Sequence, residues 1–166
     1  MSISAYKFRP HGAKYAYKTD RGGIFTDDTA ELLRECNAGI KMGVESIEDV
    51  LERVGDGELS GILSRSMREH QSLGSETHAL LEGRGISGKE PAVMARGMSW
   101  LKTEVMLAAG DNAAAADLIT DGCNMGVKSL CRYLNKYAAA DEKSKDIAKR
   151  LVAIEEQLAC DMRDYL

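Results

Sequence analysis

Proline and aromatic residues are scarce in this sequence. Two prolines and 5% aromatic residues occur among 166 residues, beside eight methionines. Sheets favour aromatic and β-branched side chains, whereas unbranched residues such as methionine and alanine favour helices. The composition therefore predicts an all-α chain, and the length is that of about one ordinary domain.

Long apolar runs are also missing. None approaches the roughly 18 residues that span a bilayer. The N-terminal residues 1–6 have no apolar stretch typical of a signal peptide. We therefore expect a cytoplasmic protein with no membrane partner.

Charge divides the chain into two parts. The formal net charge is −4; residues 1–25 hold five basic side chains and one acidic one, so the rest of the chain carries −8. Aromatic and basic residues alternate in this first part, which we interpret as an N-terminal basic aromatic arm, either a hairpin or flexible. Residues 26–166 form the predicted bundle, whose acidic charge argues against nucleic acid binding to it.

Motifs of common catalytic sites are absent as well. The sequence has no Gly-x-Ser-x-Gly elbow, P-loop, dinucleotide fingerprint or His-Glu-x-x-His motif, which argues against an enzyme. The four cysteines form no Cys-x-x-Cys pair, and we predict small, reduced core side chains, with a thiol or metal site as the alternative. They are Cys36, Cys123, Cys131 and Cys160.

What the sequence does contain is a heptad ladder. Leu33, Ile40, Ile47 and Val54 recur every seven residues, which predicts a long helix over about 28–54 that lies against long neighbours. Apolar stripes predict further helices over the following ranges: 58–82, a shorter one from Pro91 to about 109, 113–137 and 142–166. This order predicts an antiparallel four-helix bundle with a shorter crossover helix between the second and third long helices.

Local sequence adds a family resemblance. Residues 95–102, Ala-Arg-Gly-Met-Ser-Trp-Leu-Lys, are followed by Gly-Asp-Asn at 110–112. Together with Cys-Asn-Ala-Gly-Ile-Lys at 36–41 and Arg-Glu-His-Gln-Ser-Leu at 68–73, they resemble an uncharacterised bacterial family of ferritin-like four-helix-bundle proteins. The resemblance covers about residues 28–166 and implies a ferritin-like fold.

The ligand pattern of a ferritin-like di-iron centre is not present. Such a centre takes one inward Glu from each of two helices and a Glu-x-x-His from each of the other two. This sequence contains no Glu-x-x-His, and it has only three histidines. We therefore expect no cofactor, although iron or another divalent metal is the alternative.

His70 is the polar residue of greatest interest, because it shares an apolar stripe with Met67 and Gly74. It is either a buried, hydrogen-bonded imidazole or a metal ligand. The candidate metal ligands are His70, Asp161, Glu104 and Glu69, with Cys160 or Cys123 as possible additions. Glu69 lies about 100° around the helix from His70, so the two cannot both point directly inward. Glu155 and Glu156 are predicted on a solvated face.

Three functions follow from these observations. The first is a non-catalytic ferritin-like bundle, a structural or interaction module that forms a homodimer. The second is a divergent metal-binding protein with an incomplete site around His70. The third is a small-ligand carrier whose cavity lies in the core near Gly43, Gly74 and Gly122. Gly122 and Gly126 are also predicted to permit close helix packing.

Overall fold

The computed structural model describes residues 16–18, 24–87 and 111–166, and the statements below concern these residues. Their elements are β1 Ala16–Lys18, β2 Ile24–Thr26, α1 Asp27–Leu51, α2 Gly57–Gly83, α4 Asn112–Lys136, α5 Glu142–Asp161 and the 3-10 turn η1 Met162–Tyr165. The two short strands pair antiparallel, with Tyr17 opposite Phe25. Everything else that is regular in the described chain is helical, which confirms the all-α prediction.

Aspartate residues define where three of the helices begin. The Asp56 carboxylate accepts hydrogen bonds from the backbone N–H groups of the first turn of α2, and Asp111 and Asp141 do the same for α4 and α5. These bonds satisfy N–H groups that have no partner within a helix. The observed bounds lie within a few residues of the predicted ones, except at the C-terminus, where α5 gives way to η1. The helix predicted from Pro91 lies outside the described residues.

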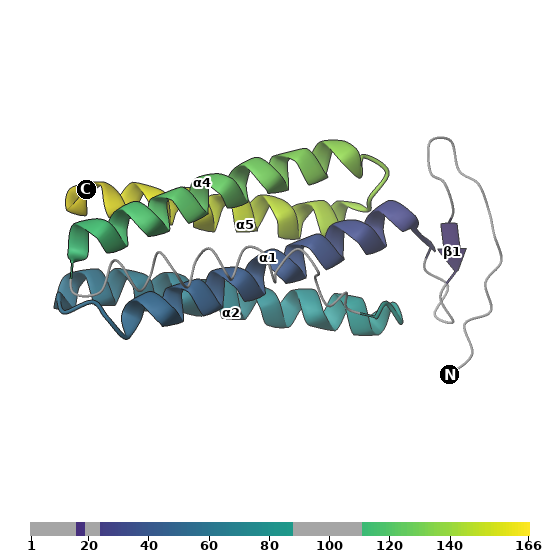
Figure 1. Cartoon of the computed structure of the whole chain (residues 1–166). Coiled ribbons are helices and arrows are strands. Elements are labelled where there is room, and N and C mark those ends of the chain that lie inside the picture. The colour runs from purple at the N-terminus through teal and green to yellow at the C-terminus, as the bar shows by residue number, and fades with distance from the viewer. Residues whose placement is uncertain (1–15, 19–23, 88–110) are drawn as a thin grey trace.

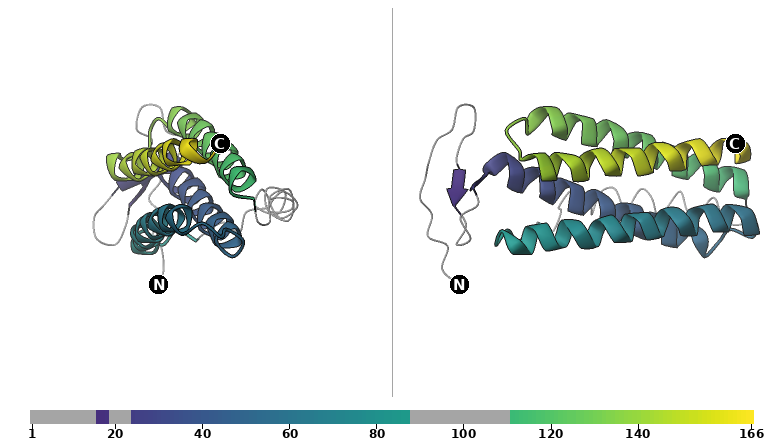
Figure 2. Two further views of the ribbon diagram at one scale, coloured as in Figure 1. Left: turned by 90° about the vertical axis from the view of Figure 1, so that its left-hand side faces the viewer. Right: turned by 180° about the vertical axis from the view of Figure 1, so that it is seen from behind.

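The four long helices form two hairpins (Figures 1 and 2). A short turn at 52–56 joins α1 to α2, and residues 137–141 join α4 to α5; within each pair the helices run in opposite directions. Between the hairpins, α5 packs against both α1 and α2, and α4 packs against α1. None of the described helices is long and apolar enough to cross a membrane.

The interior contains two hydrophobic clusters, one toward each end of the bundle. In α1, Ile40 belongs to the first cluster and Ile47 to the second; in α5, Leu151 and Leu158 divide in the same way. Three rungs of the heptad ladder, Leu33, Ile40 and Ile47, are buried, and Val54 is half-buried against the second cluster. Helices α2 and α4 also contribute residues to both clusters. Between the two clusters lies a short layer that comprises Gly43, His70, Gly126 and Glu155.

Candidate functional site

His70 occupies the middle of the bundle. Its side chain is 1% exposed, which confirms that the stripe on α2 points inward. The ring nitrogen Nδ1 lies 2.9 Å from the backbone carbonyl oxygen of Ser66, one helical turn earlier. Because a carbonyl oxygen only accepts hydrogen bonds, Nδ1 carries the proton of that bond. The ring orientation is thereby fixed, and Nε2 points away from α2.

Glu155 is the residue that Nε2 faces. It lies on α5, in the other hairpin, and it is buried with 8% exposure. Its Oε1 is 3.6 Å from Nε2 of His70. That separation suits an ion pair but exceeds hydrogen-bond length, and Nε2 is accordingly a buried nitrogen without a hydrogen-bond partner. The prediction of a solvated Glu155 is therefore wrong.

Two glycines make room for this pair. A Cβ atom on Gly43 would lie 3.0 Å from Cδ2 and 3.1 Å from Nε2 of His70, so the ring rests on the backbone of α1. A Cβ atom on Gly126 would lie 3.1 Å from Oε1 of Glu155, so the carboxylate rests on the backbone of α4. Each of the four helices thus contributes one residue to what we call the polar layer: Gly43, His70, Gly126 and Glu155.

The electrostatic surroundings favour a proton on His70. Burial acts in the opposite direction and lowers the pKa of the imidazole, because a charged ring is poorly solvated in the core. The Glu155 carboxylate outweighs this effect, with help from the Ser66 carbonyl and from Glu69, so the pKa of His70 is raised above its ordinary value. At the other side of the layer, burial and then Glu155 raise the pKa of the Cys123 thiol.

Two of the candidate metal ligands, Glu69 and Asp161, do not form a cluster with His70. Glu69 is exposed, and Asp161 is occupied by other side chains: its Oδ2 accepts from Nη2 of Arg65 at 2.9 Å and its Oδ1 from Nε2 of Gln157 at 2.6 Å. Glu104 lies outside the described residues. Within residues 16–18, 24–87 and 111–166, no three His, Cys, Asp or Glu residues are grouped so as to hold a metal ion.

The cysteines and glycines correct two further expectations. All four thiols are free, but only Cys36 and Cys123 are buried; Cys131 and Cys160 are exposed, so the prediction of core positions is wrong for these two. Gly126 does lie at a close helix contact. Gly122, one turn earlier, is exposed, and a Cβ atom added to it would have no neighbour within 4 Å, so its predicted packing role is wrong.

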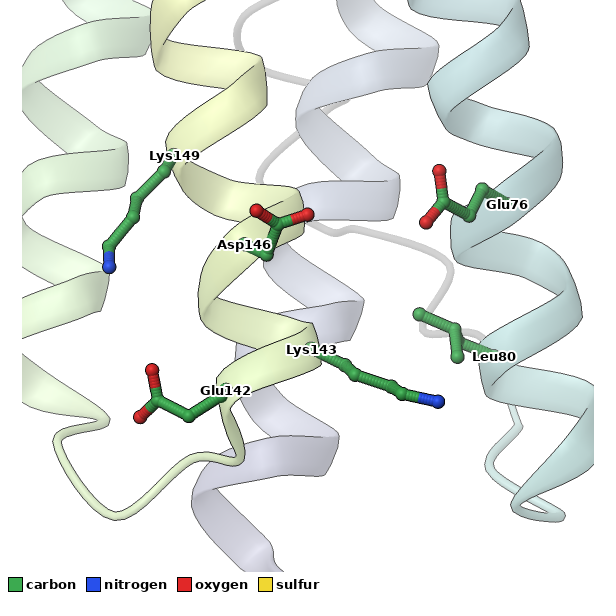
Figure 3. Close-up of a pocket in the computed structure, with 6 residues that line it drawn as sticks. All are labelled: Glu76, Leu80, Glu142, Lys143, Asp146 and Lys149. Carbon is green, nitrogen blue, oxygen red and sulfur yellow. The ribbon is translucent and has the colours of Figure 1, made fainter.

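A surface groove between α2 and α5 is the other candidate site (Figure 3). It is lined by Glu76, Leu80, Glu142, Lys143, Asp146 and Lys149. Figure 3 shows Lys143 extending toward Leu80, whereas Glu142 and Lys149 point to the α4 side. Three carboxylates and two ammonium groups alternate here, and Arg150 already binds Glu76 at 2.7 Å. Because positive and negative side chains are mixed in the groove, it has no charge preference for an anionic or a cationic ligand.

Comparisons with known proteins agree with an all-helical fold. No protein-family model and no curated protein matches the chain. Among solved structures, a DUF305 fragment from Deinococcus radiodurans is similar, with a TM-score of 0.68 and 14% sequence identity. The match covers 84% of this chain and 95% of that one. At this identity the likeness concerns the fold.

Proposed function

We propose that this protein is a non-catalytic, ferritin-like helical bundle that acts as a structural or interaction module. The observation that carries the proposal is the closed polar layer. Its buried ionisable groups, His70 and Glu155, are directed at each other, and the space beside them at Gly43 and Gly126 is filled. The layer therefore uses its own polar groups to join helices.

The ferritin-like assignment is supported by the order of the elements. Two long helices are followed by the 88–110 segment and by two more long helices, which is the sequence of elements in ferritin-like bundles with one crossover connection. The resemblance of residues 36–41 and 68–73 to a bacterial ferritin-like family points in the same direction.

Packing around the glycines argues against a ligand cavity in the centre of the core. Beside Gly43 the space is taken by His70, and beside Gly74 a Cβ atom would lie 3.0 Å from Cγ2 of Ile40. A cavity for a small molecule needs several hundred cubic ångströms in most proteins, about 300–1,000 Å3. The carrier hypothesis is the weaker one for this reason.

Elemental analysis is the experiment that tests the proposal. The full chain is purified without a metal-affinity tag and analysed for iron, zinc and manganese per protein molecule. We expect substoichiometric amounts of every metal. One equivalent that disappears in H70Q would instead support the divergent metal-binding protein and contradict the structural module.

The oligomeric state is a separate part of the proposal. We propose a cytoplasmic homodimer, and light scattering on the full chain measures its mass directly. The monomer has a mass of 18.1 kDa, so a dimer gives twice that value. A mass that stays at the monomer value as the protein concentration rises would contradict self-association.

A further inference from the structure

The His70–Glu155 contact joins the two hairpins. His70 belongs to the α1–α2 hairpin and Glu155 to the α4–α5 hairpin. The other ion pairs between the hairpins lie closer to solvent. Arg150 and Glu76 are each about half exposed, the Arg65 side chain is 57% exposed, and the side chains of Arg84 and Asp141 are 14% and 31% exposed. Within the described residues, His70 and Glu155, with side chains 1% and 11% exposed, form the most deeply buried ion pair between the hairpins.

The hydrogen-bond geometry makes this contact depend on one proton. Nδ1 of His70 donates to the Ser66 carbonyl, so in a neutral ring Nε2 has a lone pair and no hydrogen. That lone pair would face Oε1 of Glu155 at 3.6 Å, one acceptor opposite another. With a proton on Nε2, the same geometry places an imidazolium opposite a carboxylate, and the contact becomes attractive.

We propose that the His70–Glu155 pair is a pH-sensitive clamp between the two helical hairpins, closed while His70 is protonated and weakened when the proton leaves. This inference goes beyond the proposed function and does not depend on it. A bundle with a clamp of this kind is held together most firmly in mildly acidic solution and loosens across its middle as the solution becomes alkaline.

Few other groups act on the clamp. On its own helix, His70 meets the Ser66 carbonyl at 2.9 Å, the Ser66 hydroxyl at 3.4 Å from Nδ1, and the charge of Glu69. From α1 it meets the backbone at Gly43, and from α5 the carboxylate of Glu155.

On the far side of the layer, Glu155 rests against Gly126 and lies beside the Cys123 thiol, both on α4. Burial and Glu155 raise the pKa of that thiol, so it stays uncharged in neutral solution. Protonation of His70 is therefore the event that changes the charge of the layer near neutral pH.

The sign of the pH effect follows from the direction of the shift. The pKa of His70 is higher in the folded protein than its ordinary value, about 6.5 in an unfolded chain. The clamp therefore contributes its full stabilisation at pH values below the pKa of His70 in the unfolded chain. This contribution is lost as the pH rises through the pKa of His70 in the folded protein. In E155Q the carboxylate that raises the pKa of His70 is gone, while the burial that lowers this pKa remains. The loss of stability with rising pH therefore disappears or reverses in this variant.

Urea unfolding of the full chain as a function of pH is the first test. Wild type, H70Q and E155Q are compared between about pH 5.5 and 9, where most Asp and Glu side chains are already ionised. H78Q is the matched control, because His78 lies on the same helix but its side chain is 66% exposed, beside Glu82. We expect wild type and H78Q to lose stability with rising pH relative to H70Q and E155Q. Parallel pH profiles for wild type and H70Q would overturn the proposal.

A second test uses only the wild-type protein, so it does not require the variants to fold. The chain has three histidines, and the Cε1 protons of their rings are followed by NMR through a pH titration. We expect the buried ring of His70 to titrate above the ordinary histidine value of about 6.5. A midpoint for His70 at or below about 6.5 would show that the ring is largely neutral at pH 7, and the clamp would be refuted.

Discussion

The carboxylate of Glu155 and the imidazole of His70 lie 3.6 Å apart, and each rests on the backbone of a glycine in a different helix. This arrangement explains why the hydrophobic core is divided. Polar side chains are buried without a large cost in free energy only where each group has a partner, and here the pair also needs room beside the neighbouring helices. Gly43 and Gly126 leave that room because they have no Cβ atom, and His70 and Glu155 are each other's partners.

The first prediction concerns the two glycines of α4. In G126A the new methyl group would lie 3.1 Å from Cδ and Oε1 of Glu155, which has little room to move, whereas in G122A it would meet nothing within 4 Å. Replacing an exposed helical glycine stabilises a helix by about 0.5–1 kcal/mol, so G122A should be more stable than wild type. We expect G126A to be about 1–3 kcal/mol less stable than G122A because of overpacking. Urea unfolding measures both, and equal stabilisation would show that Glu155 is not confined.

The second prediction tests the same idea in α1. G43A would bring a methyl group within 3.0 Å of the His70 ring, whereas G39A would place one 3.7 Å from Cδ2 of Leu151, an ordinary contact. We expect G39A to fold with at least wild-type stability and G43A to be destabilised by about 1–3 kcal/mol. Thermal unfolding followed by circular dichroism distinguishes the two. A G43A protein as stable as G39A would mean that the ring of His70 shifts without cost.

The helices are predictable from the sequence because their signals are local. Apolar spacing identifies each stripe, and Asp56, Asp111 and Asp141 precede the helices that they cap. An error of a few residues at each end does not change which face is buried. These features depend on residues within one or two turns of one another, which the sequence displays directly.

The polar layer is only half predictable. The apolar stripe of α2 identifies His70, but the sequence-based expectation for Glu155 is a solvated face, although this residue lies four positions after Leu151 and three before Leu158, both of which are buried. That spacing is the signal that could have revealed it. A carboxylate on an apolar stripe is buried only if it has a partner, and its partner is 85 positions away in another hairpin, so helix packing decides the outcome.

The third prediction concerns Asp141, the N-cap of α5. Its Oδ1 accepts hydrogen bonds from the Ser144 backbone N–H at 2.8 Å and hydroxyl at 2.7 Å, and its Oδ2 binds Arg84 at the end of α2. D141A removes a cap and an ion pair together, so we expect it to lower the free energy of unfolding by about 2–3 kcal/mol.

D111A is the matched control for D141A. Asp111 caps α4 through Ala113 and Ala114, at 3.0 and 3.4 Å, and it is exposed. Its loss should cost about 1 kcal/mol, the ordinary value of an N-cap. Chemical denaturation of both variants gives the difference. A D141A protein no less stable than D111A would show that Arg84 contributes nothing through this ion pair.

The fourth prediction compares a core residue with a surface residue. Leu151 is completely buried in the first cluster, whereas Met125 on α4 is 58% exposed. L151A leaves a cavity and should cost about 2–5 kcal/mol, while M125A should change stability by no more than about 0.5 kcal/mol. Calorimetric melting temperatures report both changes. Similar melting temperatures for the two variants would contradict the packing of the first cluster.

The last prediction concerns thiol reactivity. Cys131 and Cys160 are exposed, whereas Cys36 and Cys123 are buried. Burial raises the pKa of Cys36 to about 12, and burial together with Glu155 also raises the pKa of Cys123, so neither forms much of the reactive thiolate at pH 8. We expect a disulfide reagent to modify two thiols quickly in the native protein and the other two only after denaturation. The C131S/C160S variant should lose the fast phase entirely. Fast labelling of Cys123 in that variant would instead show that solvent reaches the polar layer, because its thiol lies beside the Glu155 carboxylate.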